Sequence, residues 1–454
     1  MDIIKRHASE NAVRGTLVNS YRRSNKWQTM KTICLVKGLS GAGKTMLLLD
    51  CFKDKKTFYF SFAGLIENIA ETFFAEYVTK QTGISVTDWE ESITAVSKKY
   101  RVILFDDVSS VLSSEKFCKA FYDNMITNMF TRPFVAIITQ PTDDVKGLAD
   151  EYDSIKVDYF TLPEVMRLFP TLSKFDILGL CTVSGGIPRI FNEYDNQKSL
   201  DENLRTFLIP SSAFCNLMPE MLLKYFRKPE SYHYILYAIA NGNQSVSEIG
   251  KFTGFAYNKC DNYLSVLVSC GFLKTEKTLS KRGAEKTVYV LANNYFRLWY
   301  LYVYINRTEI QLGNEELINS IVQTIIKKEI HEYHMQKAFT LANERIRWDL
   351  WESFRITEKA VYAPQTISKG DFIYTFDAIM RKDDKAIFIK VFSDPLENCK
   401  KDELKKIRKA VMLTNVYYDS HVFIFSKRRF SDYAVAQAAN DGAISLVEVD
   451  RLRF

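Results

Sequence analysis

The feature that most constrains this chain is a glycine-rich run near its start, Gly38-Leu-Ser-Gly-Ala-Gly-Lys-Thr45. A short β-rich run, Lys31–Lys37, precedes it, and a helical run, Met46–Phe52, follows it. Glycines let a backbone wrap closely around phosphate groups because no Cβ intrudes, and the start of a helix presents N–H groups at its positive end. A strand, this spacing and a helix, in that order, predict a phosphate-binding loop.

Such a loop predicts a nucleoside triphosphate with Mg²⁺ as its ligand. Lys44 should reach the β- and γ-phosphates, and the Thr45 hydroxyl should hold the metal. The sequence shows no Asn/Thr-Lys-x-Asp motif for reading guanine, which favours ATP over GTP. The loop residues expected to contact the nucleotide are Gly38, Leu39, Ser40, Gly41, Ala42, Gly43, Lys44 and Thr45.

A second strand should bring an acid to the metal. Arg101–Asp107 reads as a buried parallel strand that ends in two aspartates. We expect Asp106 to lie beside Mg²⁺ together with Thr45, and Asp107 to orient or deprotonate the attacking water. Many ATPases of this type have Glu at the second position, and Asp is one methylene shorter, so ATP binding is a firmer expectation than fast hydrolysis.

Two further strands, Thr57–Phe62 and Pro133–Thr139, predict a doubly wound parallel sheet between helices. Thr139, at the end of its strand, is a candidate sensor of the γ-phosphate or an ordinary strand-end threonine. Downstream, Val183–Arg189 interrupts a mostly helical region. Arg189 is a candidate nucleotide contact from a helical lid, with a surface arginine after a turn as the alternative.

The middle of the chain predicts a winged helix-turn-helix. Tyr232–Asn241, a helix opened by the capping box at Ser245–Glu248, and Ala256–Cys270 give three helices, and Thr287–Leu291 gives a returning strand. DNA is a candidate partner, with an internal packing role as the alternative. The basic residues that would neutralise phosphates are Lys274, Lys277, Lys281, Arg282 and Lys286.

The last third of the chain predicts an α/β unit with the element order of a restriction-endonuclease-like fold. Phe372–Ile379 and Lys385–Phe392 read as a hairpin, followed by a helix, a strand, a helix and a strand. Asp377 and Lys390 fit two positions of the nuclease metal site, but Phe388 occupies the glutamate position and does not ligate Mg²⁺. We therefore expect a degenerate nuclease domain that serves to bind a partner, such as another protein.

Composition sets the broad class. The 454 residues predict about three domains, and the net charge of +7 is compatible with a nucleic-acid partner or with an ordinary lysine-rich surface. The eight scattered cysteines form no C-x-x-C pair, which is typical of reduced thiols. No signal peptide or membrane-spanning stretch is evident, so we expect a cytoplasmic protein with no membrane contact.

The ordered set of motifs resembles the prokaryotic "archaeal ATPase" family of the AAA/STAND type. The resemblance covers most of the chain, through the phosphate loop, Ile103–Asp107, Gly185–Pro188, Tyr295–Trp299 and Phe425–Ser431. It implies a P-loop ATPase core over residues 1–160, a helical lid over 161–228, a winged helix over 229–306 and a nuclease-like α/β domain over 307–454. Carried over by position, it implies that Lys44, Thr45 and Asp106 bind Mg-ATP.

The leading functional hypothesis is an ATP-dependent conformational switch or a weak ATPase that acts on DNA or a protein partner. Two alternatives from other classes remain open at this point. One is a DNA-binding or protein-interaction module that uses ATP structurally, without turnover. The other is an ATP-regulated nuclease.

Overall fold

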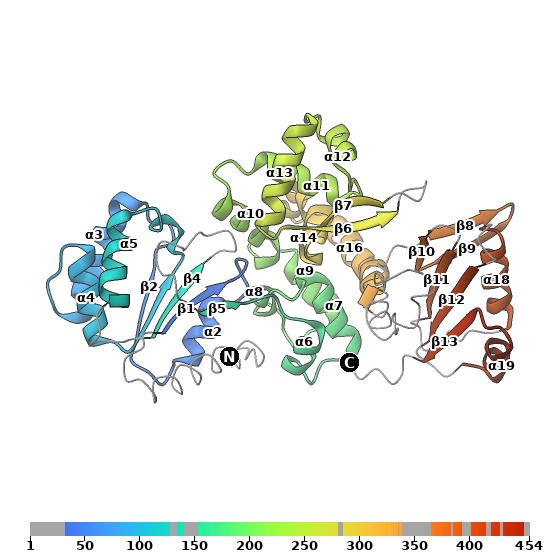
Figure 1. Cartoon of the computed structure of the whole chain (residues 1–454), viewed down its shortest axis with the longest axis horizontal. Helices are drawn as coiled ribbons and strands as arrows, with labels where there is room; N and C mark the ends of the chain where they lie inside the picture. Colours follow the sequence, from blue (N-terminus) through green and yellow to red (C-terminus); the bar gives the residue numbers. More distant parts are fainter. Residues whose placement is uncertain are drawn as a thin grey trace. The chain divides into compact units, whose positions relative to one another are not determined.

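The computed structural model describes residues 32–127, 134–139, 153–279, 285–334, 336–337, 365–382, 385–392, 401–414, 419–426 and 430–448. The chain divides into two compact units, and Figure 1 labels its helices and strands. The first comprises Met1–Lys274 with Val290–Ile318, and the second comprises Thr275–Tyr289 with Asn319–Phe454.

A five-stranded sheet in the first unit positions the phosphate loop. Its order is β2-β3-β4-β1-β5, and every neighbouring pair is parallel. The strands are β1 (Thr32–Lys37), β2 (Thr57–Ser61), β3 (Val102–Asp106), β4 (Phe134–Thr139) and β5 (Asp153–Lys156). The predicted parallel P-loop NTPase sheet is thus confirmed, with one strand, β5, that the sequence analysis did not predict.

Helices cover both faces of this sheet because every second strand residue points to the same side. In β1, Ile33 and Leu35 belong to one hydrophobic core, whereas Cys34 and Val36 belong to the other. The helices α3 (Glu67–Thr82), α4 (Trp89–Lys99) and α5 (Glu115–Phe121) pack on the first core and gather on one side of the sheet in Figure 1. The helix α2 (Lys44–Cys51) packs on the second. Two short turns of helix, η1 (Val108–Ser110) and η2 (Tyr122–Thr127), flank α5.

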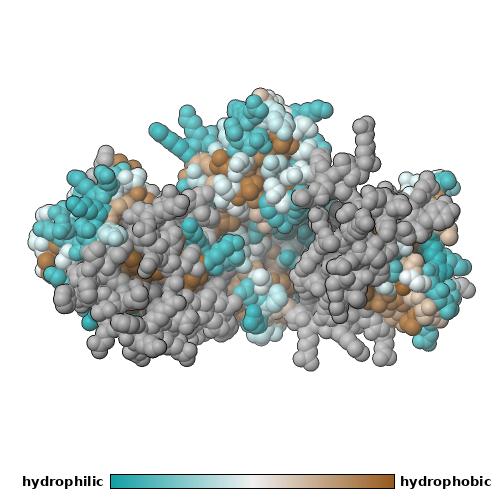
Figure 2. All heavy atoms as spheres, viewed as in Figure 1, coloured by the Kyte–Doolittle hydropathy of each residue, from teal (hydrophilic) through white to brown (hydrophobic). Residues whose placement is uncertain are grey.

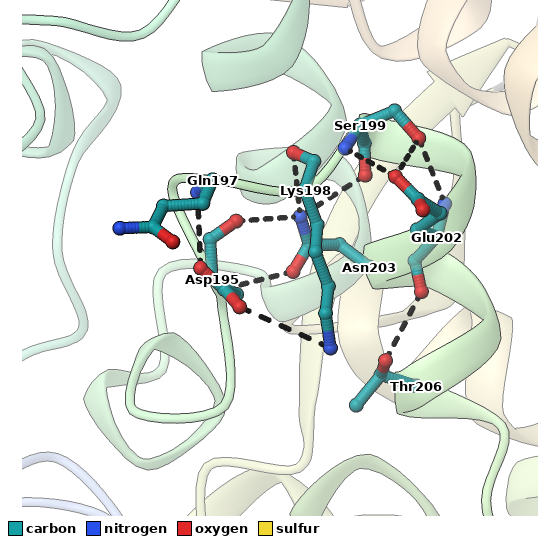
Figure 3. A network of polar contacts seen from close by, with 7 residues as sticks. All are labelled: Asp195, Gln197, Lys198, Ser199, Glu202, Asn203 and Thr206. Atoms are coloured by element: carbon teal, nitrogen blue, oxygen red, sulfur yellow. Dashed lines mark hydrogen bonds and ion pairs between the residues drawn. The ribbon is translucent and has the colours of Figure 1, made fainter.

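A helical region follows the sheet. Its helices are α6 (Leu162–Leu168), α7 (Lys174–Ser184), α8 (Pro188–Phe191), α9 (Leu200–Phe207) and α10 (Ala213–Tyr225). The start of α9 is fixed by the polar network in Figure 3, in which Ser199 and Glu202 form a capping box. Asn203, which is fully buried, donates to the backbone carbonyls of Asp195, Lys198 and Ser199.

The three helices and the returning strand predicted for a winged helix are present in the predicted order, together with a further strand, β6, that was not predicted. They are α11 (Glu230–Ala240), α12 (Val246–Thr253), α13 (Tyr257–Ser269), β6 (Leu273–Leu279) and β7 (Glu285–Leu291), the last two forming a two-stranded sheet. The capping box of Ser245 and Glu248 opens α12 as predicted. The identity of the module as a winged helix stays a prediction.

The segment that follows β7 is helical, and its first two elements are rich in aromatic residues. It comprises α14 (Asn294–Leu298), η3 (Trp299–Tyr304), α15 (Arg307–Gln311), α16 (Glu315–Thr324) and η4 (Ile325–Glu329). Tyr295 donates from its hydroxyl to the carbonyl of Phe214, and the indole N–H of Trp299 donates to the carbonyl of Cys215. These buried bonds tie α14 and η3 to α10.

The second unit contains a four-stranded sheet of order β10-β11-β12-β13 and a separate pair, β8-β9. Its elements are β8 (Gln365–Lys369), β9 (Phe372–Phe376), β10 (Ala378–Lys382), β11 (Lys385–Phe392), α18 (Lys401–Met412), β12 (Asp419–Ser426), α19 (Asp432–Asn440) and β13 (Ile444–Glu448). β10 and β11 are antiparallel, and the other two pairs of the four-stranded sheet are parallel.

One expectation for this unit is wrong. Phe372–Ile379 is two strands in two sheets, with the break at Asp377. The cause is the aspartate itself. The backbone N–H of Asp377 donates to the Ile389 carbonyl, and the Asp377 carboxylate accepts the N–H of Val391 at 2.8 Å. The Asp377 side chain thus accepts a hydrogen bond near the end of β11.

The described surface mixes hydrophilic and hydrophobic residues on the face shown in Figure 2. None of the helices in the described ranges combines the length and the apolar character needed to cross a bilayer.

Candidate nucleotide-binding site

The phosphate loop has a backbone that only glycine adopts easily. Gly41 and Gly43 have φ of 78° and 82°, in the left-handed region where a Cβ is costly. Gly38 is needed for a different reason, because a Cβ there would lie 2.3 Å from the carbonyl oxygen of Val157. The glycine positions in the motif are therefore required by the loop geometry and by its packing beside β5.

Lys44 is folded over this loop. Its ammonium group donates to the carbonyls of Gly38 at 2.7 Å and Leu39 at 3.0 Å, and the residue is only 7% exposed. Helix α2 begins at Lys44, and its N-cap residue, Gly43, supplies no capping side chain. The loop thus places a buried cation and the positive end of a helix at one point.

Thr45 and Asp106 meet, as the predicted magnesium site requires. The Thr45 hydroxyl donates to Oδ2 of Asp106 at 2.5 Å, and Asp106 is only 8% exposed. The other carboxylate oxygen accepts the backbone N–H of Asp107 at 2.9 Å. Parallel strands β1 and β3 end at the same edge of the sheet, which explains why two residues so far apart in sequence come together.

Tyr59 is a third member of this cluster that the sequence analysis missed. Its hydroxyl donates to Oδ2 of Asp106 at 3.1 Å from the neighbouring strand β2. Burial, reinforced by the Asp106 charge, raises the pKa of Tyr59 to about 12. The phenol therefore stays protonated near neutral pH and acts as a fixed donor to the carboxylate. No local motif marks it, because the contact depends on the pairing of β2 with β3.

Asp107 has an unusual backbone and a partner from the helical region. Its φ of 51° is the only positive value at a residue other than glycine in the described ranges. Its Oδ2 lies 3.2 Å from the ammonium of Lys224, near the end of α10. Asp107 thus forms an ion pair across to α10, while Asp106 beside it contacts Thr45.

The turn at Gly185–Pro188 lies against the phosphate loop. Gly186 has φ of 84°, and a Cβ there would lie 2.0 Å from the carbonyl oxygen of Phe160. The Phe160 N–H donates to the Gly186 carbonyl at 2.9 Å, which locks the turn beside the end of β5. The Pro188 side chain is 3.5 Å from the position that a Cβ on Gly43 would take.

Arg189, the predicted lid contact, follows this turn directly. Its guanidinium forms a two-pronged ion pair with Glu220 of α10, in which Nη1 contacts Oε2 and Nη2 lies 3.2 Å from Oε1. Arg189 thus follows a residue that packs on Gly43, and its guanidinium has an acidic partner on α10.

Two other contacts link the loop to the helical elements. The Leu217 side chain of α10 lies 3.6 Å from the position of a Cβ on Gly41, and Leu39 lies 3.5 Å from the position of a Cβ on Gly271. Gly271 forms the turn between α13 and β6. The loop thus contacts Leu217 of α10 and the turn that follows α13.

The remaining predicted residues fall only partly within the described structure. Thr139 ends β4 in register with Lys37, and its side chain lies outside the described atoms. Lys274 is exposed at the start of β6. The side chains of the other basic residues predicted for the wing lie outside the described part of the chain: Lys277, Lys281, Arg282 and Lys286.

The nuclease-like positions of the second unit form a buried ion pair. Lys390 Nζ lies 3.6 Å from Oδ2 of Asp377, and burial raises the pKa of the Asp377 carboxyl above its ordinary value despite this neighbouring cation. Phe388 is fully buried in the hydrophobic core of this unit. The structure thus pairs Asp377 with Lys390 and buries Phe388, the residue at the predicted glutamate position, in the hydrophobic core.

No protein-family model matches the chain. The uncharacterized protein MJECL04 of Methanocaldococcus jannaschii is 21% identical over 301 residues, which are 62% of this chain and 66% of that protein. The matched region thus spans slightly less than two thirds of the relative.

Several solved structures show similarity to part of this chain. The Walker-type ATPase PABY2304 of Pyrococcus abyssi is 16% identical, with a TM-score of 0.46 over 66% of this chain and 96% of that one. The Aeropyrum pernix ORC1 protein, solved in complex with DNA, is 13% identical, with a TM-score of 0.34 over 68% and 95%. The RuvB branch migration motor of Thermotoga maritima is 14% identical, with a TM-score of 0.34 over 63% and 92%.

Proposed function

We propose that the chain binds Mg-ATP at Gly38–Thr45 and acts as an ATP-dependent conformational switch or a weak ATPase. The observation that carries this proposal is the 2.5 Å contact between the Thr45 hydroxyl and Asp106, beside a loop whose glycines adopt left-handed backbone. A hydroxyl and a buried carboxylate are the oxygen donors that Mg²⁺ prefers. The loop, the cation and the oxygen donors together fit a metal–triphosphate.

Each loop residue has a defined part in this proposal. The Lys44 ammonium exchanges the neutral carbonyls of Gly38 and Leu39 for charged phosphate oxygens, which form stronger hydrogen bonds. Backbone N–H groups at the start of α2 receive further phosphate oxygens. Thr45 and Asp106 hold Mg²⁺, which when bound neutralises charge on the β- and γ-phosphates.

Residues around the loop complete the proposed site. Asp107, which directly follows β3, is the candidate for orienting the attacking water, and Thr139, the last residue of β4, is the candidate sensor of the γ-phosphate, since both lie at the edge of the sheet where the phosphate loop begins. Arg189 is the candidate lid cation, because the preceding Pro188 packs against Gly43. Each of these three side chains would have to be close to the terminal phosphate when the nucleotide binds.

The contacts of the loop with α10 and α13 support the switch. Leu39 lies against Gly271, and Phe272, the next residue, packs edge-on against Tyr225 at the end of α10, with ring centroids 5.2 Å apart. A change in the loop or in α10 therefore acts directly on the end of α13 and the start of β6. A ligand shifts the equilibrium between two conformations only through contacts that differ between them. We propose that the contact of Leu39 with Gly271 and the contact of Phe272 with Tyr225 differ in this way.

In the proposed switch, the other predicted domains contact DNA or a protein partner. In this proposal residues 1–160 and 161–228 form the ATPase core and its lid, residues 229–306 form a winged helix that contacts DNA, and residues 307–454 contact a protein partner. Phe388 in place of an acid argues against a third function, ATP-regulated cleavage of DNA. Incubation of plasmid with Mg²⁺ or Mn²⁺ should leave it intact.

Phosphate release by the purified protein tests the turnover part of the proposal. We expect slow release that Lys44→Ala abolishes, because the substitution removes the buried ammonium from the phosphates. Equal release by the wild type and by Lys44→Ala would contradict turnover at this site.

A second candidate function is supported by the ion pair of Asp107 with Lys224. If that pair persists with nucleotide bound, Asp107 cannot deprotonate water, and the protein is a DNA-binding or protein-interaction module that holds ATP structurally. Measurement of nucleotide affinity with and without DNA separates the two. A switch requires that DNA change ATP affinity and that ATP change DNA affinity by the same factor, and Leu39→Ala should reduce that factor.

A further inference from the structure

One face of α10 carries three residues that contact three parts of the nucleotide site. Leu217, Glu220 and Lys224 are spaced three and four residues apart and so share a helix face. Leu217 covers Gly41, Glu220 pairs with Arg189, and Lys224 pairs with Asp107. The face thus reaches from the phosphate loop to the end of β3.

We propose that Lys224 is a nucleotide-sensing residue, which exchanges Asp107 for the terminal phosphate of bound ATP. The inference rests on the proposed ATP site and adds a residue to it. Asp107 directly follows Asp106, whose carboxylate contacts Thr45, so the Lys224 ammonium is paired with the residue next to the proposed metal ligand. The metal of a bound metal–triphosphate contacts the terminal phosphate.

The ion pair of Lys224 with Asp107 is easily replaced by a pair of Lys224 with a phosphate group. Lys224 and Asp107 are 43% and 23% exposed, and a partly exposed ion pair of this kind contributes little to stability. A phosphate oxygen accepts from an ammonium group at least as well as a carboxylate does. The exchange therefore keeps the lysine neutralised while it frees the Asp107 carboxylate beside the metal.

Freed from Lys224, Asp107 becomes able to contact the attacking water. ADP has no terminal phosphate, so with ADP the pair of Lys224 and Asp107 persists. The same exchange thus makes α10 respond to ATP and not to ADP, and it gives Asp107 its catalytic position only in the ATP-bound state. Because α10 ends at Tyr225, which packs on Phe272, the response reaches the predicted winged helix.

The decisive experiment compares the affinities of ATP and ADP for the full chain and its variants. In Lys224→Met, we expect ATP affinity to fall about tenfold, as for one lost charge-assisted hydrogen bond, and ADP affinity to stay within about twofold. Lys224→Arg should recover most of the ATP affinity. In Asp107→Asn, the competing carboxylate is gone, so the ratio of ATP to ADP affinity should rise.

The matched control is Lys198→Met. Lys198 also lies in the helical region and also pairs with an aspartate, Asp195, within the network of Figure 3. Its substitution should change neither affinity. In the double variant that combines Lys224→Met with Asp107→Asn, the rise caused by Asp107→Asn alone should disappear, because the two substitutions act through one interaction.

Two results would overturn the inference in distinguishable ways. If Lys224→Met weakens ATP and ADP equally, or neither, while the wild type binds both, Lys224 is only a structural tie between α10 and β3. If the wild type binds neither nucleotide, the proposed ATP site itself is wrong. Thermal unfolding without nucleotide confirms that each variant is folded before its affinities are compared.

Discussion

The hydroxyl of Thr45 lies 2.5 Å from Oδ2 of Asp106, although the two residues are 61 positions apart in the chain. Thr45 is in the first turn of α2, and Asp106 is the last residue of β3. The contact exists because β1 and β3 run in parallel and end at one edge of the sheet. It joins the phosphate loop to the acidic end of β3 and so sets the proposed position of Mg²⁺.

Removal of the Thr45 hydroxyl should weaken the binding of Mg²⁺ and leave the binding of the phosphates largely unchanged. In Thr45→Val, which keeps the side-chain shape, we expect the Mg²⁺-dependent part of ATP affinity to be lost, a reduction of about tenfold or more. Binding of ATP in EDTA should change little. Thr45→Ser retains the hydroxyl and is the control, so an equal loss in both variants would contradict the assigned role.

Tyr59 should stabilise the fold through Asp106. Tyr59→Phe removes a donor from a nearly buried carboxylate, and we expect a loss of about 1–2 kcal/mol in the free energy of unfolding, measured by denaturant titration. Because burial raises the pKa of Tyr59 to about 12, this loss should be constant from pH 6 to pH 9. Tyr257→Phe, at an exposed tyrosine, should cost almost nothing. Similar costs for both would argue against the hydrogen bond.

Gly186 should be irreplaceable for two reasons. Gly186→Ala adds a Cβ to a residue with a left-handed backbone. This Cβ would lie 2.0 Å from the Phe160 carbonyl oxygen, so the turn beside the phosphate loop must move. We expect a loss of roughly 3 kcal/mol or more in the free energy of unfolding, together with weaker ATP binding. Gly254→Ala has a similar φ of 74° but open space around the Cβ. It should cost only about 1 kcal/mol.

Acid should destabilise the first unit through His233. Burial, with Arg307 nearby, lowers the pKa of His233 from 6.5 to about 4. Between these values the unfolded chain binds a proton that the folded chain does not, so stability is complete above pH 6.5 and falls as the pH drops toward 4. The loss should amount to roughly 1–3 kcal/mol.

The comparison that checks this uses thermal unfolding at pH 7.5 and pH 5. His233→Gln should be less stable at pH 7.5, because His233 bonds the Tyr300 hydroxyl at 2.9 Å, but should lose less stability on acidification. His331→Gln, at an exposed histidine, should leave the wild-type pH dependence unchanged. An unaltered dependence in His233→Gln would mean that other groups cause the acid sensitivity.

The sequence predicted the phosphate loop and the strand of Asp106 because their signals are local. The glycine spacing and the apolar run each specify a shape within a few residues of the chain. The same holds for the capping box of Ser245 and Glu248. Such features need no knowledge of the tertiary fold.

The partners of the predicted site could not be found in this way. Tyr59 reaches Asp106 through strand pairing, and Lys224 reaches Asp107 only when α10 folds over the loop. The break at Asp377 within an apolar, strand-like run is also non-local, because it depends on the N–H of Val391. The short strand β5 has four residues and no strong alternation that would reveal it.

Equilibrium titration of the purified full chain with Mg-ATP is the most direct test of the central claim. We predict saturable binding of one ATP per chain that weakens by at least about a hundredfold in Lys44→Ala, since that variant lacks the buried ammonium of the loop. If neither Mg-ATP nor Mg-GTP binds to the wild-type protein, the phosphate loop is not a nucleotide site and the account is wrong.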